Sequence, residues 1–425
     1  MSTFTVDAYQ NEYLPLGGSE VNAVVTVTSD GAGGPAGQPD AAEIVIADTS
    51  GSMGAPEAKI KAAREATSVA IDCISDGVLF GVIAGTEKAR VVYPLNGKLA
   101  PASSDTRAAA KQAVSHLAAG GGTAMGSWLS LAAKLFRGAP GRNCHAILLT
   151  DGANQHETPA MLDAVLTEVE GGFQCDCRGV GTDWQVSELR RIASRLLGTA
   201  DIIAHPGDMA EDFRYLMETA MGKSSGNVSL RVWTPQGATV TFVRQVAPTI
   251  EELTDRRVPV NPLTADYPTA TWGAEARDYH LCITVPPREA GEEMLAGRIS
   301  LVEGDEIRAQ ALVRATWTDD RQLSTRINRE VAHYTGQAEL AECIQEGLEA
   351  RKNGDLDTAT YKIGRAVQLA ADSGNDGTMK LLQAVVEVED AATGTVRLKR
   401  DVAVVDEMSL DTRSTTTVRV GAGGS

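Results

Sequence analysis

Three short segments of this 425-residue chain carry hydroxyl and carboxyl side chains at spacings that suit a metal ion. Asp48, Ser50 and Ser52 alternate in one tight loop, directly after an apolar run. Thr123 follows three consecutive glycines, and Asp151 comes directly after a later apolar run. Hard divalent cations such as Mg²⁺ prefer oxygen ligands of this kind. The sequence therefore predicts a cation site assembled from three loops.

The segments around these loops alternate between short apolar runs and helical patterns. Strands are expected over residues 44–47, 78–84, 146–149, 174–180 and 202–204. Helices are expected over residues 57–74, 105–117, 124–136, 159–168, 187–197 and 209–221. This alternation is typical of an α/β fold with a doubly wound, mainly parallel sheet and helices on both faces. Ligands bind such sheets outside the carboxyl ends of the strands, where the three loops are expected to meet.

The rest of the chain divides around this α/β domain, which is expected over residues 40–222. Period-two patterns predict a β-sandwich over 225–320. The alternating run at 20–28 predicts that residues 1–30 contribute a strand to this sandwich, although the Gly/Pro-rich linker at 31–38 and the α/β domain separate the two in sequence. A short helical region is expected over 325–392, with helices near 337–352, 355–372 and 375–389, and a tail over 393–425.

The end of that tail, residues 412–425, is rich first in threonine and then in glycine, and is expected to be partly disordered. Its threonines suggest kinase sites at Thr415 and Thr417, each with a valine three positions later. The competing interpretation is a β-strand that adds to a sheet edge, because the same residues have high strand propensity.

The amino-acid composition disfavours some classes of binding partner. Lys plus Arg number 39 and Asp plus Glu number 56, so the net charge is 39 − 56 = −17, which disfavours nucleic acid and anionic lipid surfaces. No apolar run is long enough to span a membrane, and the first residues lack the features of a secretion signal, so we expect a cytoplasmic protein. The six cysteines form no Cys-x-x-Cys pair and are expected to be reduced thiols.

Taken together, Asp-x-Ser-x-Ser, Gly-Gly-Thr and Thr-Asp-Gly resemble the metal-ion-dependent adhesion site of von Willebrand factor type A domains, which have a Rossmann-like fold. The resemblance implies a divalent ion, usually Mg²⁺, with Mn²⁺ or Ca²⁺ as alternatives. It implies that Ser50 and Ser52 coordinate directly, Thr123 directly or through water, and Asp48 and Asp151 mostly through water. An Asp or Glu of a protein partner would then complete the ligand shell.

The whole layout also resembles uncharacterised bacterial cytoplasmic proteins that join this domain to a β-sandwich and a helical segment. The resemblance implies a non-catalytic binding protein, in phosphoprotein signalling or complex assembly. Two alternatives remain open: an Mg²⁺-dependent hydrolase, and a subunit that works with a ring ATPase. The chain has no complete Gly-x-x-x-x-Gly-Lys-Ser/Thr phosphate loop and only His156 as a weak candidate base, which disfavours the hydrolase. The sequence leaves the oligomeric state open.

Two further residues are expected near the rim of the site. His156 follows Asp151 and is expected to be a solvated rim residue rather than a ligand. Trp184 follows the strand at 174–180 and either contacts a partner or covers the end of the sheet. Cys175 and Cys177 share one strand face, and two buried thiols are favoured over metal ligands there.

Overall fold

The computed structural model describes residues 3–31, 41–223, 225–226 and 228–420. Most of the expected linker at 31–38 and the glycine-rich end at 421–425 lie outside the described residues. The chain forms two compact units: one spans Gly34–Gly226, and the other combines Met1–Gly33 with Asn227–Ser425. The first unit is therefore inserted into the sequence of the second.

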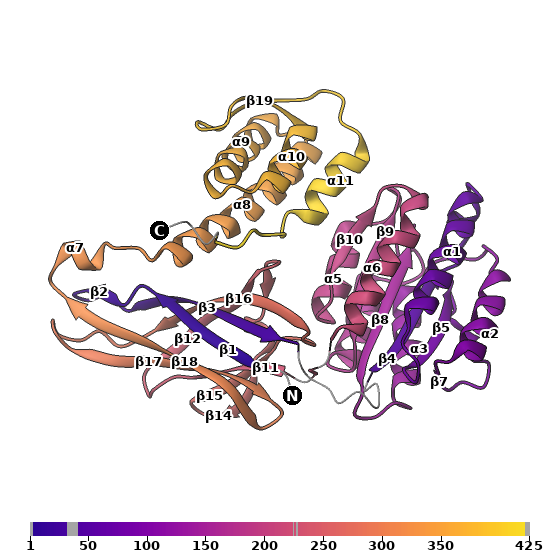
Figure 1. The fold of residues 1–425 in the computed structure, drawn as a ribbon. Helices are drawn as coiled ribbons and strands as arrows, with labels where there is room; N and C mark the ends of the chain where they lie inside the picture. Colours follow the sequence, from indigo (N-terminus) through magenta and orange to yellow (C-terminus); the bar gives the residue numbers. More distant parts are fainter. Residues whose placement is uncertain (1–2, 32–40, 224, 227, 421–425) are drawn as a thin grey trace. The chain divides into compact units, whose positions relative to one another are not determined.

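The first unit is built on a seven-stranded sheet (Figure 1). Its strands are β4 (Ala41–Asp48), β5 (Leu79–Gly85), β6 (Arg90–Tyr93), β7 (Ala100–Pro101), β8 (Asn143–Thr150), β9 (Gln174–Val180) and β10 (Ala200–Ile203). The order β10-β9-β8-β4-β5 is parallel throughout, whereas β6 and β7 pair with β5 in the antiparallel sense. The predicted mainly parallel sheet is confirmed, but the two short edge strands were not expected from the sequence.

Helices cover both faces of this sheet. They are η1 (Gly51–Gly54), α1 (Ala58–Cys73), α2 (Ser104–Ser115), α3 (Met125–Phe136), α4 (Pro159–Val169), α5 (Val186–Arg195), η2 (Pro206–Asp208) and α6 (Met209–Met221). Buried residues of α1, α2 and α6 pack in one core against the sheet, and α3, α4 and α5 are absent from that core. Proline at the first position of α4, after the N-cap Thr158, shows how local sequence fixes a helix start.

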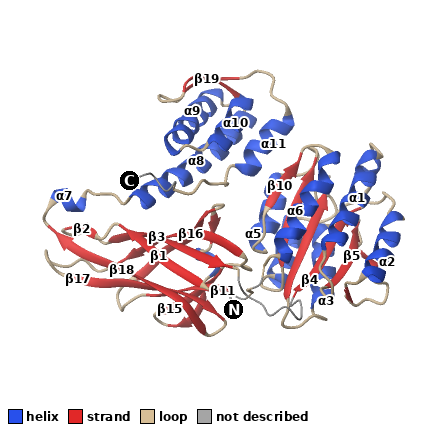
Figure 2. Ribbon diagram, viewed as in Figure 1, coloured by secondary structure: helices blue, strands red, loops and turns tan. Residues whose placement is uncertain are grey.

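The second unit contains two larger sheets (Figure 2). One has the order β1-β3-β16-β12-β13, and the other β14-β15-β11-β17-β18-β2. Their strands are β1 (Phe4–Gln10), β2 (Tyr13–Pro15), β3 (Glu20–Asp30), β11 (Val228–Trp233), β12 (Thr239–Ala247), β13 (Glu251–Glu252), β14 (Val258–Asn261), β15 (Thr264–Pro268), β16 (Ala274–Thr284), β17 (Glu293–Glu303) and β18 (Glu306–Thr318), with η3 (Thr254–Arg256) between β13 and β14. β3 lies between β1 and β16 and is antiparallel to both, so the N-terminal segment supplies an internal strand.

The C-terminal helices belong to the same unit. They are α7 (Arg321–Ser324), α8 (Arg329–Lys352), α9 (Leu356–Ser373), α10 (Asp376–Val385) and α11 (Val404–Arg413). The helix expected to reach residue 389 ends at Val385, and the chain continues as a hairpin of β19 (Val386–Asp390) and β20 (Thr395–Leu398). The Val-x-Val pattern at the start of β19 favours a strand, which explains the early end of the helix.

Residues 414–420, the described part of the tail end, contact the five-stranded sheet, which matches the competing interpretation for this segment. Thr416 forms a β-bridge with Thr249, and Thr417 Oγ1 donates a hydrogen bond of 2.6 Å to the carbonyl of Val246. Arg419 makes two hydrogen bonds, 2.8 and 2.7 Å long, to the buried carboxylate of Asp278. Because the Thr417 hydroxyl is buried and bonded, a phosphate does not fit there in this conformation.

Candidate metal centre

The three predicted loops meet at the carboxyl ends of β4 and β8. Backbone hydrogen bonds join the first loop to the second: Gly51 N to Gly121 O (2.9 Å) and Gly120 N to Thr49 O (2.8 Å). Gly121 has a φ of +82°, a conformation that is strained for other residues. The buried side chain of Met53 anchors η1 in the core. The loops that carry the hydroxyl groups are thereby held in fixed register.

Asp48 ends β4 and is completely buried beneath the loops. Its Oδ1 accepts a hydrogen bond of 2.7 Å from the Ser50 backbone N–H, and its Oδ2 accepts one of 2.6 Å from Thr150 Oγ1. Burial raises the pKa of Asp48 to about 6, although hydrogen bonds from Ser50 and Thr150 oppose the shift. The carboxylate therefore orients its neighbours with both oxygens.

Asp151, the first residue after β8, is also completely buried. Its Oδ1 accepts a hydrogen bond of 2.6 Å from Ser52 Oγ, and Ser52 Oγ lies 3.0 Å from Ser50 Oγ. Its Oδ2 accepts a hydrogen bond of 2.7 Å from the Lys59 ammonium group. Both carboxylates of the site are thus engaged by protein donors, while the hydroxyl oxygens keep lone pairs for a ligand.

Thr123 brings the third hydroxyl to the same place. A methyl group added at Gly152 would lie 3.3 Å from Ser52 Oγ and 3.8 Å from Thr123 Oγ1, so both hydroxyls face one small space. Ser50 and Thr123 are buried, whereas Ser52 is exposed and opens that space to solvent. This set of neutral hydroxyls beside two carboxylates fits a hard divalent cation. Among the residues that the structure describes, no group of three or more His, Cys, Asp or Glu side chains offers another metal site.

His156 lies beside Thr123 and is exposed. Its ring Nδ1 accepts a hydrogen bond of 3.2 Å from the Thr123 backbone N–H, and the His156 backbone N–H donates one of 3.0 Å to Thr123 O. The imidazole is therefore protonated on Nε2 in this arrangement. It also fills the space over Gly122, where an added methyl group would lie 1.9 Å from Cε1. His156 positions the threonine loop from the rim.

Trp184 belongs to the core instead of the rim. Only 3% of the residue is exposed, and its indole covers Gly179 in β9, where an added methyl group would lie 2.0 Å from the ring. The indole N–H donates a hydrogen bond of 2.9 Å to Gly181 O. Of the two alternatives that the sequence left open, this geometry matches an aromatic residue that covers the sheet end. The large ring fits there because glycine leaves the strand face free.

Other residues of the site were not anticipated from the sequence. Glu157 accepts hydrogen bonds from the backbone N–H groups of Gly126 (2.7 Å) and Ser127 (3.0 Å) at the start of α3. Glu87 accepts one of 2.7 Å from Gly122 N. These carboxylates satisfy N–H groups that the loop and the first helical turn leave free. Their partners are distant in sequence, so spacing alone gave no signal.

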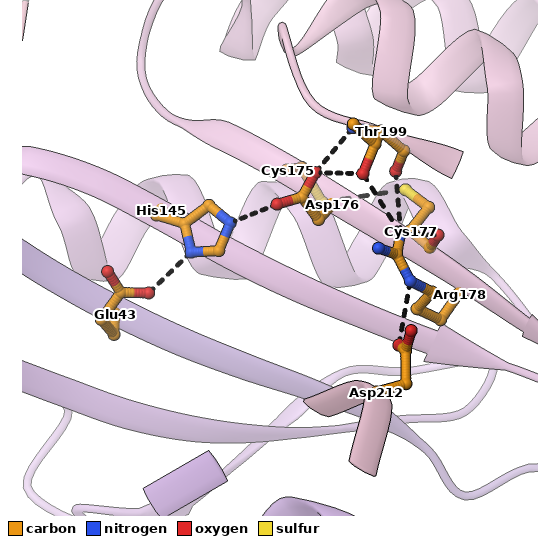
Figure 3. A network of polar contacts seen from close by, with 8 residues as sticks. All are labelled: Glu43, His145, Cys175, Asp176, Cys177, Arg178, Thr199 and Asp212. Carbon is orange, nitrogen blue, oxygen red and sulfur yellow. Dashed lines mark hydrogen bonds and ion pairs between the residues drawn. The ribbon is translucent and has the colours of Figure 1, made fainter. Parts of the chain in front are cut away.

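A second polar network crosses the amino-terminal halves of β4, β8 and β9 (Figure 3). The buried His145 contacts Glu43 Oε2 through Nδ1 (2.7 Å) and Asp176 Oδ2 through Nε2 (2.9 Å). Burial alone lowers the pKa of His145, but the two carboxylates outweigh this effect and raise it to about 9. Near this network, Cys175 and Cys177 are buried, free thiols with their sulfur atoms 4.0 Å apart. The network is an internal charge cluster of the sheet.

Comparison with known proteins shows which family the chain resembles. The von Willebrand factor type A domain matches residues 42–202, and the von Willebrand factor type A C-terminal domain matches residues 368–414. A solved von Willebrand factor type A structure from Catenulispora acidiphila is 52% identical, covers 98% of this chain and 97% of that chain, and superposes with a TM-score of 0.94.

Two more distant proteins are also similar. The ArnB paralog VWA2 from Sulfolobus acidocaldarius shares the fold, with a TM-score of 0.59 and 14% identity over 99% of this chain and 100% of that chain. The uncharacterized protein sll0103 of Synechocystis sp. is 29% identical over 221 residues, which cover 49% of each protein. The chain thus spans about half the length of that curated relative. With a relative that is 52% identical over nearly its whole length, this chain belongs to the von Willebrand factor type A family.

Proposed function

We propose that this protein is a non-catalytic binding module that captures an acidic side chain of a protein partner through a divalent cation. Domains of this family often mediate protein–protein interaction, and some members bind a metal ion at this position. One observation carries the proposal: three hydroxyl groups converge where both nearby carboxylates already have protein donors.

In this proposal Ser50, Ser52 and Thr123 hold the ion, while Asp48 and Asp151 act mostly through water and hydrogen bonds. The ion is Mg²⁺, with Mn²⁺ or Ca²⁺ as substitutes. Because the direct protein ligands are neutral, the bound ion supplies a centre that still attracts an external carboxylate. Exposed Ser52 and Gly121 leave that centre accessible to a partner of protein size.

The proposal extends to the setting in which the protein works. Its net charge of −17 disfavours nucleic acid and anionic lipid and leaves a protein as the partner. No helix in the described part of the chain is long and apolar enough to cross a membrane. All six cysteines are free thiols, which fits the reducing cytoplasm. We place its function there, in phosphoprotein signalling or complex assembly.

Calorimetry tests the metal site directly. The full chain is expected to bind one Mg²⁺ or Mn²⁺, and Thr123→Ala is expected to lose at least about tenfold in affinity because a ligand hydroxyl disappears. Ser127→Ala is the matched control, since its hydroxyl donates a hydrogen bond of 2.8 Å to the carbonyl of Ala124, the residue before α3. Equal binding by wild type and Thr123→Ala would contradict the assignment.

Affinity capture from the native host then tests the partner. Wild-type protein in Mg²⁺ is expected to retain a partner that is lost in EDTA and is not retained by Thr123→Ala. The two alternative functions give different results. A hydrolase would turn over phosphoesters in an EDTA-sensitive manner, and a chelatase-like subunit would retain a ring ATPase.

A further inference from the structure

Lys59 places a positive charge inside the candidate metal centre. It is the second residue of α1, and only 9% of the residue is exposed. Its ammonium group lies 2.7 Å from Asp151 Oδ2 and 3.6 Å from Asp183 Oδ2. Asp183 is 72% exposed at its side chain, so solvent screens its charge, whereas Asp151 is completely buried. The close interaction of Lys59 is therefore with a residue of the metal site.

This position is electrostatically unfavourable for a lysine unless Asp151 compensates it. The first turn of a helix repels cations through the helix dipole, and burial of an ammonium group carries a desolvation cost. The carboxylate of Asp151, 2.7 Å from the ammonium group and completely buried, supplies that compensation. The ammonium group of Lys59 and the hydroxyl group of Ser52 thus contact the two oxygens of the same carboxylate.

Lys59 changes the net charge of the buried groups at the candidate metal centre. Asp48 and Asp151, when ionised, contribute −2, and Lys59 contributes +1, so the buried site carries −1. A divalent ion would change this sum to +1, which a single carboxylate of a partner would neutralise. Without Lys59 the loaded site would already be neutral. The lysine therefore opposes the metal and favours the acidic ligand.

Building on the proposed function, we propose that Lys59 sets the charge of the metal centre: it weakens binding of the divalent cation and strengthens binding of a carboxylate to the loaded site. Removing the charge of Lys59 should therefore strengthen binding of the divalent cation and weaken binding of the carboxylate. This distinguishes a charge effect from general damage to the site, which would weaken both.

The experiment uses the full chain, with Mn²⁺ and acetate as probes. Electron paramagnetic resonance measures the dissociation constant for Mn²⁺, and broadening of the acetate methyl signal by bound Mn²⁺ measures carboxylate binding. Lys59→Met is expected to bind Mn²⁺ at least about fivefold more tightly and acetate at least about threefold more weakly, because one charge a few ångströms away is removed. Lys59→Arg keeps the charge and is expected to stay within about twofold of wild type.

Lys61→Met serves as the positional control, because Lys61 lies on the same helix but is exposed. If Lys59→Met is too unstable without metal, the rise in its melting temperature with increasing Mn²⁺ replaces the resonance measurement, and a larger rise than in wild type is expected. Unchanged or weaker Mn²⁺ binding by Lys59→Met, or unchanged acetate binding, overturns the inference. Failure of wild type itself to bind Mn²⁺ instead overturns the proposed function.

Discussion

At the scale of single residues, Asp48 shows how burial prepares a carboxyl group for a cation. Burial raises its pKa from 3.8 to about 6 even though Ser50 and Thr150 donate hydrogen bonds to it. The ionised form is thus destabilised in the metal-free fold and would be favoured by a positive ion nearby. We therefore expect metal affinity to fall as the pH drops below about 6.

The same shift predicts how stability depends on pH in chelator. Between pH 3.8 and about 6 the folded state binds more protons at Asp48 than the unfolded state, so its contribution falls as pH rises through this window. Relative to Asp48→Asn, wild type should lose up to about 3 kcal/mol in unfolding free energy between pH 4 and pH 7. Urea titrations at both pH values measure this. A pH-independent difference between the two proteins would show that Asp48 does not titrate as described.

At the scale of elements, the network of Glu43, His145 and Asp176 links three neighbouring parallel strands. Both ring nitrogens of His145 face carboxylate oxygens, so the imidazolium form is stabilised by charge on either side. Buried charges of this kind hold strands in register because a slip would leave them unpaired. The sheet that presents the metal loops is thereby fixed from its opposite end.

This network predicts an alkaline loss of stability. The folded pKa of His145 is raised from 6.5 to about 9, so its stabilising contribution is complete below pH 6.5 and is lost as the pH rises toward and through 9. Denaturant titrations of residues 34–226 measure the free energy of unfolding at each pH. Between pH 6.5 and pH 9.5 this free energy should fall more for wild type than for His145→Gln. Parallel pH profiles for the two proteins would argue against a charged histidine.

The segment 414–420 offers a second test at this scale. Arg419, Tyr334 and Thr26 all bond to the buried Asp278, so the tail, α8 and β3 share one carboxylate. Arg419→Ala should cost about 1 to 3 kcal/mol, because Asp278 loses a charged partner that is itself partly exposed. Hydrogen exchange of residues 415–418 should increase in parallel. The double variant with Asp278→Asn should cost less than the sum of the single variants, and simple additivity would contradict the coupling.

At the scale of the whole molecule, two sections of sequence on either side of the α/β unit build one set of sheets. β3 pairs with β16 over eleven consecutive positions, beginning with Glu20 opposite Thr284 and ending with Asp30 opposite Ala274. Its apolar residues Val21, Ala23, Val25 and Val27 are fully buried. An internal strand of this length cannot be removed without exposing the strands on both sides.

We therefore predict that a chain lacking residues 1–31 fails to fold its second unit, whereas residues 34–226 alone fold cooperatively. Circular dichroism and denaturant unfolding of the two fragments test this, with the full chain as control. Fusing residues 1–31 to 228–420 through a flexible linker should restore a cooperative transition. A stable, cooperatively unfolding 228–420 fragment would show that β3 is dispensable.

The sequence predicted the α/β core and the hydroxyl loops well because both depend on local pattern. Strand β9 and helix α6 have the expected bounds, and each parallel strand lies where an apolar run predicted it. Lys59 was missed because its role depends on Asp151, 92 positions away, and nothing local marks a helix-start lysine as buried. For residues 414–420 the sequence left two alternatives open, because a threonine-rich segment gains structure only from the sheet that it meets.

The pairing of β3 with β16 has a consequence for folding during translation. Thr26 and its partner Asp278 are 252 positions apart, and the whole α/β unit is translated between them. At about 5 to 20 residues per second, β3 emerges from the ribosome roughly 10 to 50 seconds before β16 does. During that interval β1 is present to pair with one edge of β3, but the edge that pairs with β16 has no partner strand and is open to other chains. Substitutions in β3 should therefore affect the yield of folded protein in cells more strongly than they affect the stability of the purified protein.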